Sequence, residues 1–122
     1  MRLQPIQQPI PTTDVEILYT HQNLVTKAVT LDASKFPADA NGRKIARAGT
    51  VLGKITASGL YGPYNAGGSD GTEKADCILF NTVDLTDGNA AAAAVTQGVV
   101  REARCIGLDE TAKDALRLIE FR

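Results

Sequence analysis

The chain has few of the residues that usually build catalytic or metal sites. It contains one histidine, two cysteines and no tryptophan in 122 residues. Cys77 and Cys105 are far apart in the sequence and lack the C-x-x-C spacing of zinc ligands, so two buried thiols are expected rather than a zinc site or a disulfide framework. His21 lies among polar residues at an expected turn. Because a Ser-His-Asp or Cys-His relay would have to use this histidine, nucleophilic catalysis is disfavoured.

An excess of charge of either sign is also missing. The chain has 13 basic and 14 acidic residues and a net charge of -1. Nucleic-acid binding needs clustered Lys and Arg to displace counterions, so no nucleic-acid partner is expected. No apolar run approaches the roughly 20 residues of a membrane span, and residues 1–11 lack the apolar core of a signal peptide. These absences predict no membrane partner and a cytoplasmic protein.

Metal ligands at a useful spacing are also lacking. Asp84 and Asp87 in DLTDG offer carboxylate oxygens, but the alternating acids and the closing glutamate of an EF-hand loop are missing. Aspartate is common in turns, and a turn explains both residues better than a metal site. We therefore expect neither a metal nor a cofactor.

The length and composition favour one soluble domain that is α+β and mostly β. At 12.9 kDa the chain is 43% hydrophobic but only 5% aromatic. Domains of roughly 100 to 150 residues are the commonest, so a second domain has no room. Alanine, valine, leucine and isoleucine must fill most of the core.

The first residues, MRLQPIQQPIPTT, predict an extended arm. Prolines at positions 5, 9 and 11 prevent a helix or a central strand, while Leu3, Ile6 and Ile10 are apolar. A frayed terminus and a segment that orders on a partner both fit this pattern. The expected organisation is an extended N-terminal arm over residues 1–22 and a β-rich domain over residues 23–122.

Patterns of branched and alternating residues predict the elements of that domain. VEILYT and LVTKAVTL are expected to form one or two strands, and Asn41-Gly42 favours a hairpin turn. In AGTVLGKIT, Val51, Gly53 and Ile55 are expected to face one way and Leu52, Lys54 and Thr56 the other. Gly53 inside the strand suggests a bulge or a close backbone approach. Further strands are expected over residues 75–83, 92–104 and 119–122, with a turn at Asp87-Gly88 and a short helix capped by Asp109.

A glycine-rich stretch, GLYGPYNAGGSDGTEKA, occupies residues 59–75. It fails the P-loop pattern, because Gly71 is followed by Thr-Glu-Lys-Ala and no clear helix follows. Tyr61 and Tyr64 can hold such a loop by covering apolar surface while each hydroxyl reaches water or a backbone group. The neighbouring glycines permit tight turns, and Pro63 stiffens the segment between the two rings.

The end of the same stretch allows a second hypothesis. TEKADCIL resembles the E-x-D-K-A turn of lipoyl carrier domains, in which a lysine at a hairpin tip receives the cofactor. A lipoyl- or biotinyl-like carrier with Lys74 as attachment site is therefore the alternative function. Against it, a carrier lysine needs matching strands immediately on both sides, whereas a long loop precedes Lys74.

Four segments in sequence order carry a resemblance to a known family. AGTVLGKIT, GLYGPYNAGGSDGTEKADCIL, VDLTDG and AAVTQGVVREA together resemble the phage head decoration proteins related to the lambda capsid-stabilising protein, over residues 24–108. The resemblance implies a small β-rich, β-tulip or barrel-like domain with a short C-terminal helix. It also implies a structural cement protein, not an enzyme, that binds as a homotrimer at threefold positions outside an expanded head and resists the internal DNA pressure.

The resemblance further implies where contacts occur. The extended arm would order against the major capsid protein, and the loop would contact the trimer partner or the capsid. The protein would lie on the outer surface of the virion capsid, and in the host cytoplasm during assembly. The residues expected to make these contacts are Leu3, Pro5, Ile6, Pro9, Ile10 and Pro11 in the arm, and Tyr61, Pro63 and Tyr64 in the loop.

Overall fold

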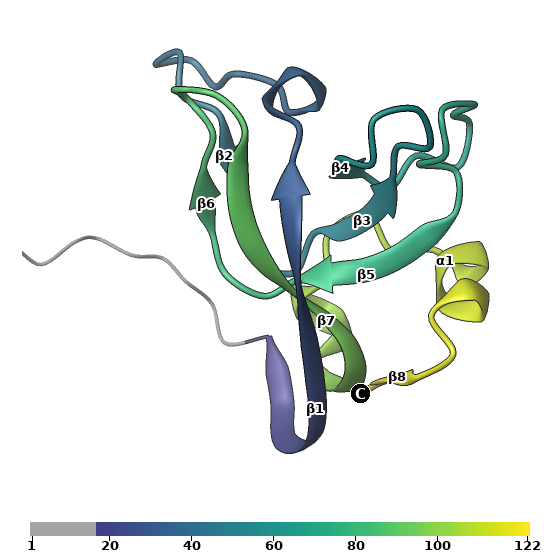
Figure 1. Ribbon diagram of the computed structural model, residues 1–122. Coiled ribbons are helices and arrows are strands. Elements are labelled where there is room, and N and C mark those ends of the chain that lie inside the picture. Colours follow the sequence, from purple (N-terminus) through teal and green to yellow (C-terminus); the bar gives the residue numbers. More distant parts are fainter. Residues whose placement is uncertain (1–16) are drawn as a thin grey trace, which may run out of the picture.

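The fold consists of two long strands with smaller elements on either side. The computed structural model describes residues 17–122, so the expected arm contacts of residues 3–11 lie outside the described residues. The long strands β1 and β7 run side by side, with the β2–β6 ribbon on one side and β3, β4, β5 and α1 on the other (Figure 1). The elements in chain order are β1 (Leu18–Leu31), η1 (Ala33–Lys35), β2 (Ile45–Ala46), β3 (Val51–Lys54), β4 (Tyr61–Pro63), β5 (Ala75–Leu79), β6 (Val83–Asp84), β7 (Ala90–Val100), η2 (Glu102–Arg104), α1 (Glu110–Ala115) and β8 (Ile119–Phe121).

The main sheet closes on itself. Its strands follow the order β1-β4-β3-β5-β7-β8, and β1 also pairs with β7, so β1, β4, β3, β5 and β7 form a closed ring. β8 extends the sheet by pairing in parallel with the end of β7. Closure removes most of the free strand edges that would otherwise invite aggregation. The expected small, mostly β domain with one short C-terminal helix is confirmed.

The pairing of β1 with β7 is the longest ladder of the fold. It is regular from Thr26, opposite Val95, to Leu31, opposite Ala90, and irregular between Leu18 and Thr26. Asn23, with a φ of 59°, lies inside the irregular part, where it accommodates the extra residues of β1. The last three residues of VEILYT and all of LVTKAVTL thus contribute to a single strand. That strand includes residues 18–22, which the sequence analysis placed in the arm.

Strand β7 contains the alanine-rich segment. Alanine favours helices, but here Ala91 to Ala94 pair with residues 27–30 of β1, and Ala94 is completely buried. Tertiary pairing therefore outweighs intrinsic propensity. The strand expected to reach Arg104 ends earlier, at Val100, because the chain turns there into η2, where the Arg104 amide donates to the Arg101 carbonyl at 3.0 Å.

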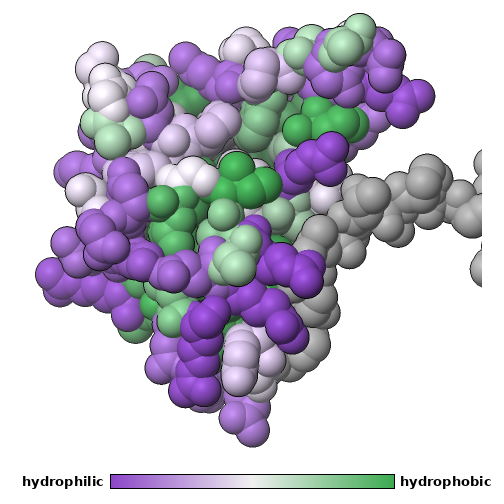
Figure 2. Space-filling view, turned by 180° about the vertical axis from the view of Figure 1, so that it is seen from behind, coloured by the Kyte–Doolittle hydropathy of each residue, from purple (hydrophilic) through white to green (hydrophobic). Residues whose placement is uncertain are grey.

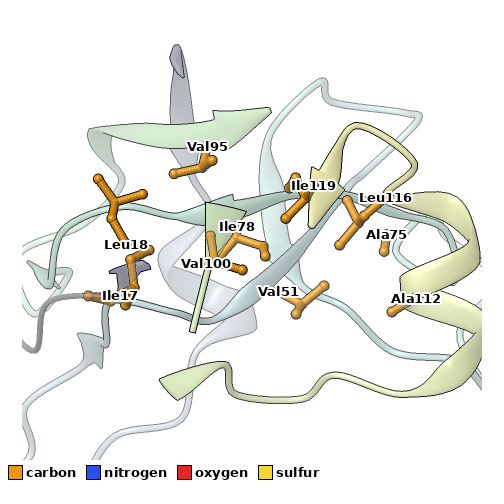
Figure 3. Close-up of a cluster of buried hydrophobic side chains, with 11 residues drawn as sticks. Ile17, Leu18, Val51, Ala75, Ile78, Val95, Val100, Ala112, Leu116 and Ile119 are labelled. Carbon is orange, nitrogen blue, oxygen red and sulfur yellow. The ribbon is translucent and has the colours of Figure 1, made fainter. Parts of the chain in front are cut away.

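Apolar side chains cover both faces of β3, β5 and β7. One cluster includes Val51, Ile78 and Val95, and the other includes their neighbours in sequence such as Leu52, Cys77 and Ala94. Figure 3 shows the first cluster, in which side chains from α1 and β8 pack on the sheet. A central layer buried on both faces explains how so few aromatic residues suffice for a core.

The short helix, the turns and the two cysteines agree only partly with the expectations from the sequence. Asp109 caps α1 as expected, and residues 119–121 return as a strand. The strand expected over residues 75–83 is divided into β5 and β6, and the following turn is present, with the Gly88 amide donating to Leu85. The turn at Asn41-Gly42 also exists, and Asp39 and Arg43 hydrogen-bond across it. It does not join two paired strands, because the strand that follows it, β2, pairs with β6. Cys77 is buried as expected, whereas Cys105 is only half-buried, and both thiols are free.

Candidate functional site

The glycine-rich stretch forms part of the barrel wall. Its first residues make β4, which pairs antiparallel with β3 and touches β1 at one parallel position, Leu31 opposite Tyr61. The remaining residues cross over β3 to reach β5. The stretch therefore contains β4 and ends at the start of β5, with Tyr61 as the first residue of β4 and Tyr64 directly after its last.

Tyr61 lies in a contact between three strands. Its side chain is buried, and its hydroxyl accepts a hydrogen bond from Lys27 Nζ of β1 at 3.0 Å. The same Nζ lies 2.5 Å from Asp76 Oδ2 of β5 and 5.1 Å from the centre of the Tyr61 ring. Desolvation lowers the pKa of Lys27, but the hydrogen bonds to Asp76 and Tyr61 outweigh it and raise the pKa overall. Desolvation also raises the pKa of Tyr61.

Tyr64 joins the loop to the helix. Its amide donates to the Val51 carbonyl at 2.7 Å, and its ring packs on the cluster shown in Figure 3. Its hydroxyl lies 3.1 and 3.2 Å from the two carboxylate oxygens of Asp109. Asp109 Oδ1 also accepts from the Ala112 amide at 2.7 Å, which is the N-cap bond of α1. Desolvation, and then the hydrogen bond to Asp109, raise the pKa of Tyr64.

Internal hydrogen bonds also hold the far end of the loop. Asp70 Oδ1 accepts from the Thr72 hydroxyl at 2.6 Å and from the Thr72 amide at 3.1 Å, and Lys35 Nζ lies 3.3 Å from Asp70 Oδ2. The hydrogen bonds from Thr72 lower the pKa of Asp70 to about 2. The half-buried Pro63 lies beside these residues in a shallow cavity of about 190 Å³.

These contacts place the three loop residues predicted as contact residues. The rings of Tyr61 and Tyr64 pack on the apolar clusters, as expected of residues that hold a loop in place. Their hydroxyls differ from the expectation, because they bind the side chains of Lys27 and Asp109 instead of water or a backbone group. Sequence reasoning missed the partners Lys27, Asp76 and Asp109. Nothing in their local patterns indicates these contacts, because Lys27 is one polar position of an alternating strand and Asp109 is explained by the helix cap alone.

The position of Lys74 does not fit the carrier hypothesis. β4 and β5 pair with opposite edges of β3, so the segment between them crosses over that strand. Lys74 precedes β5 in a turn where its amide donates to the Gly71 carbonyl at 3.3 Å. A carrier lysine at the tip of a hairpin would need two directly paired flanking strands, which this topology does not provide.

Some apolar side chains remain on the surface. Figure 2 shows an apolar area in the middle of one face, bordered by hydrophilic side chains. The large hydrophobic residues with substantial exposure are Tyr19, Val25, Ile106 and Leu118. Tyr19 differs from the others because two arginines lie near its ring: the guanidinium carbons of Arg122 and Arg101 are 5.3 and 5.7 Å from the ring centre.

Within residues 17–122, no group of three or more His, Cys, Asp or Glu residues is arranged to hold a metal ion. In the same part of the chain, no helix has the length and apolarity needed to cross a membrane.

Comparison with known families agrees with the sequence resemblance. The family model "Bacteriophage lambda head decoration protein D" matches residues 6–119. No curated protein sequence matches the chain at a significant level. The matched residues include the whole closed sheet, the glycine-rich loop and α1. Such a family implies binding to the phage capsid and a place on the virion. The chain therefore belongs to the bacteriophage lambda head decoration protein D family.

Proposed function

We propose that this chain binds as a homotrimer to the outside of the expanded phage head, at threefold positions, and stabilises the head against the pressure of packed DNA. The family match over residues 6–119 carries this proposal, because it spans nearly the whole chain and supports capsid decoration. The role is structural and requires no catalytic group. Before docking, the protein is in the host cytoplasm.

The arm is the proposed contact with the major capsid protein. Its proline positions cannot donate to a sheet ladder, so the arm would add to a sheet edge through its other residues, with apolar side chains supplying further area. The closed sheet and both apolar clusters are described from residue 17 onward. Removing residues 1–13 therefore leaves every described contact in place. The proposed arm residues are Leu3, Pro5, Ile6, Pro9, Ile10 and Pro11.

The glycine-rich loop is the proposed contact with a neighbouring subunit or with the capsid. Tyr61 and Tyr64 hold the loop against the body, and Pro63 between them is half-buried. A loop fixed at both aromatic residues loses little conformational entropy on binding. Three such subunits in one trimer would act together, because the first contact raises the effective concentration of the other two.

Truncation tests the proposal. Full-length protein and a variant lacking residues 1–13 are mixed with purified expanded heads that lack decoration, and sedimented; light scattering after size exclusion gives the oligomeric state. We expect the full-length protein to sediment with heads and the truncated protein to fold normally but remain in the supernatant. Ile6→Ser with Ile10→Ser should weaken binding, and Gln7→Ala with Gln8→Ala is the matched control.

Two results would contradict the proposal at different levels. If the truncated protein still binds heads, the arm is not part of the interface with the capsid, and the decoration role stands. A full-length protein that stays monomeric and never sediments with expanded heads would reject the decoration role described above.

A further inference from the structure

An exposed tyrosine lies next to two arginines at one place on the body. Tyr19 of β1 is 51% exposed, although it lies in a strand. Arg101 follows the end of β7 and Arg122 follows β8, and both guanidinium groups lie within cation–π distance of the Tyr19 ring. We call these three residues the Tyr19 cluster. Three different elements thus bring two positive charges to one aromatic ring.

Hydrogen bonds through Nε orient both guanidinium groups. Arg101 Nε donates to the Leu18 carbonyl at 3.2 Å, and Arg122 Nε lies 2.5 Å from Glu120 Oε2. Arg101, held at Nε, keeps its two terminal nitrogens for another acceptor, in the planar fork that suits a carboxylate. Arg122 also forms a side-chain hydrogen bond with Tyr19, so only part of its fork remains for another acceptor. Within residues 17–122, Arg101 has no carboxylate at salt-bridge distance. The nearby Glu102 is paired with Lys113.

The cluster lies where the chain enters the folded body. The Arg101 amide donates to the Ile17 carbonyl at 2.7 Å, next to the bond from Arg101 Nε to Leu18. A surface that binds the residues just before Ile17 would therefore lie close to Tyr19. An arm contact and a cluster contact could then form on the same partner without a long linker between them, which favours simultaneous binding.

We propose that the Tyr19 cluster is a second contact with the shell and binds carboxylate side chains of the major capsid protein. This inference rests on the proposed function. The guanidinium groups supply directed donors for charge-assisted hydrogen bonds to a carboxylate. The tyrosine ring supplies an apolar surface beside them, which excludes water and so strengthens these hydrogen bonds. Nucleic acid is a poorer partner for this site, because a net charge of -1 provides no extended positive field.

The test compares two double variants that lose the same charge. Arg101→Gln with Arg122→Gln removes both forks of the cluster. Arg43→Gln with Arg117→Gln removes two exposed arginines elsewhere on the body and is the matched control. Affinity for purified expanded heads is measured by sedimentation at low and high ionic strength. We expect the cluster variant to bind at least about tenfold more weakly than the control and to lose much of the salt dependence.

A lysine variant separates the fork geometry from charge. Arg101→Lys with Arg122→Lys keeps both charges but not the paired donors, so we expect affinity between that of the wild type and the glutamine variant. Full wild-type affinity in the lysine variant would overturn recognition by guanidinium forks. Thermal unfolding of each variant confirms folding; if the glutamine pair unfolds, Arg122→Gln alone, at a side chain that is 54% exposed, is measured instead.

The result that overturns the inference differs from the one that overturns the proposed function. If the cluster variant binds heads as tightly as the control, while removal of residues 1–13 abolishes binding, the cluster is not a contact and the decoration role stands. If wild-type protein does not bind heads at all, both proposals fail.

Discussion

Gly53 allows two strands and a loop to meet around β3. It lies opposite Gly62 of β4 on one side, and opposite Ala75 of β5 on the other, where the pairing register shifts. A Cβ at this position would lie 2.6 Å from Thr72 Cα and 2.8 Å from the Thr72 carbonyl oxygen. Backbone atoms cannot move aside as a flexible side chain can, so the loop reaches its position only if residue 53 has no side chain.

Gly53→Ala should therefore destabilise the fold. We expect a loss of about 1 to 3 kcal/mol in the free energy of unfolding, the usual range for overpacking. Gly67→Ala is the matched control, because its Cβ would make only an ordinary contact of 3.7 Å with Asn65 Oδ1. Urea denaturation of both variants measures the difference. Equal stability of the two variants would show that the Thr72 segment can move away from β3.

The lowered pKa of Asp70 predicts how the stability of the fold depends on acid. Its pKa is lowered from 3.8 to about 2, first by the hydrogen bonds from Thr72. Because the folded-state pKa lies below the unfolded one, ionised Asp70 stabilises the fold above pH 3.8, and this contribution is lost as the pH falls through about 2. The Thr72 amide resonance should follow that titration in NMR spectra, and Asp70→Asn should abolish the change. A midpoint at or above 3.8 would contradict this prediction.

At the scale of whole elements, Asp109 links α1 to the glycine-rich loop. It caps the helix through the Ala112 amide and accepts a hydrogen bond from the Tyr64 hydroxyl. We expect Asp109→Ala to cost about 1 kcal/mol for the lost cap, and somewhat more because Tyr64 loses its partner. Asp109→Asn keeps both acceptor functions and should cost much less. Chemical denaturation and hydrogen exchange at the Ala112 amide measure both effects.

Elements with a periodic pattern could be predicted, and those made by pairing could not. Branched or alternating residues indicated β1, β3 and β5, and a capping residue indicated α1. β4 has the sequence Tyr-Gly-Pro, which favours a turn, and becomes a strand because β3 lies beside it. β2 and β6 have two residues each, too few for any period.

The candidate site was predictable to the same extent. Two tyrosines among glycines indicated an aromatic-held loop, and both rings pack on apolar clusters as expected. Their hydroxyls bind side chains instead of the water or backbone groups that were expected. Their partners Lys27 and Asp109 lie 34 and 45 residues away from Tyr61 and Tyr64. Contacts at such separations depend on the register of the closed sheet, which a local pattern does not encode. The two arginines beside Tyr19 were missed for the same reason.

At the scale of the whole molecule, the proposed function depends on many weak sites acting together. A protein that binds only the assembled, expanded shell stabilises it by mass action, by about 2.7 kcal/mol per site at one hundred times Kd. Each site needs only moderate affinity, because a head offers many equivalent positions. The body meets this requirement with a closed sheet, and its net charge of -1 gives no strong attraction to DNA.

Mass action predicts how the rupture temperature of filled heads depends on this protein. It should rise with the concentration of free full-length protein, and above Kd it should rise with the logarithm of that concentration, because only the intact shell binds the protein. Release of DNA, followed by a dye during slow heating, gives that temperature. Protein lacking residues 1–13 is the control and should leave it unchanged at every concentration. Heads that carry the bound full-length protein and still rupture at the temperature of bare heads would show that binding occurs without stabilisation.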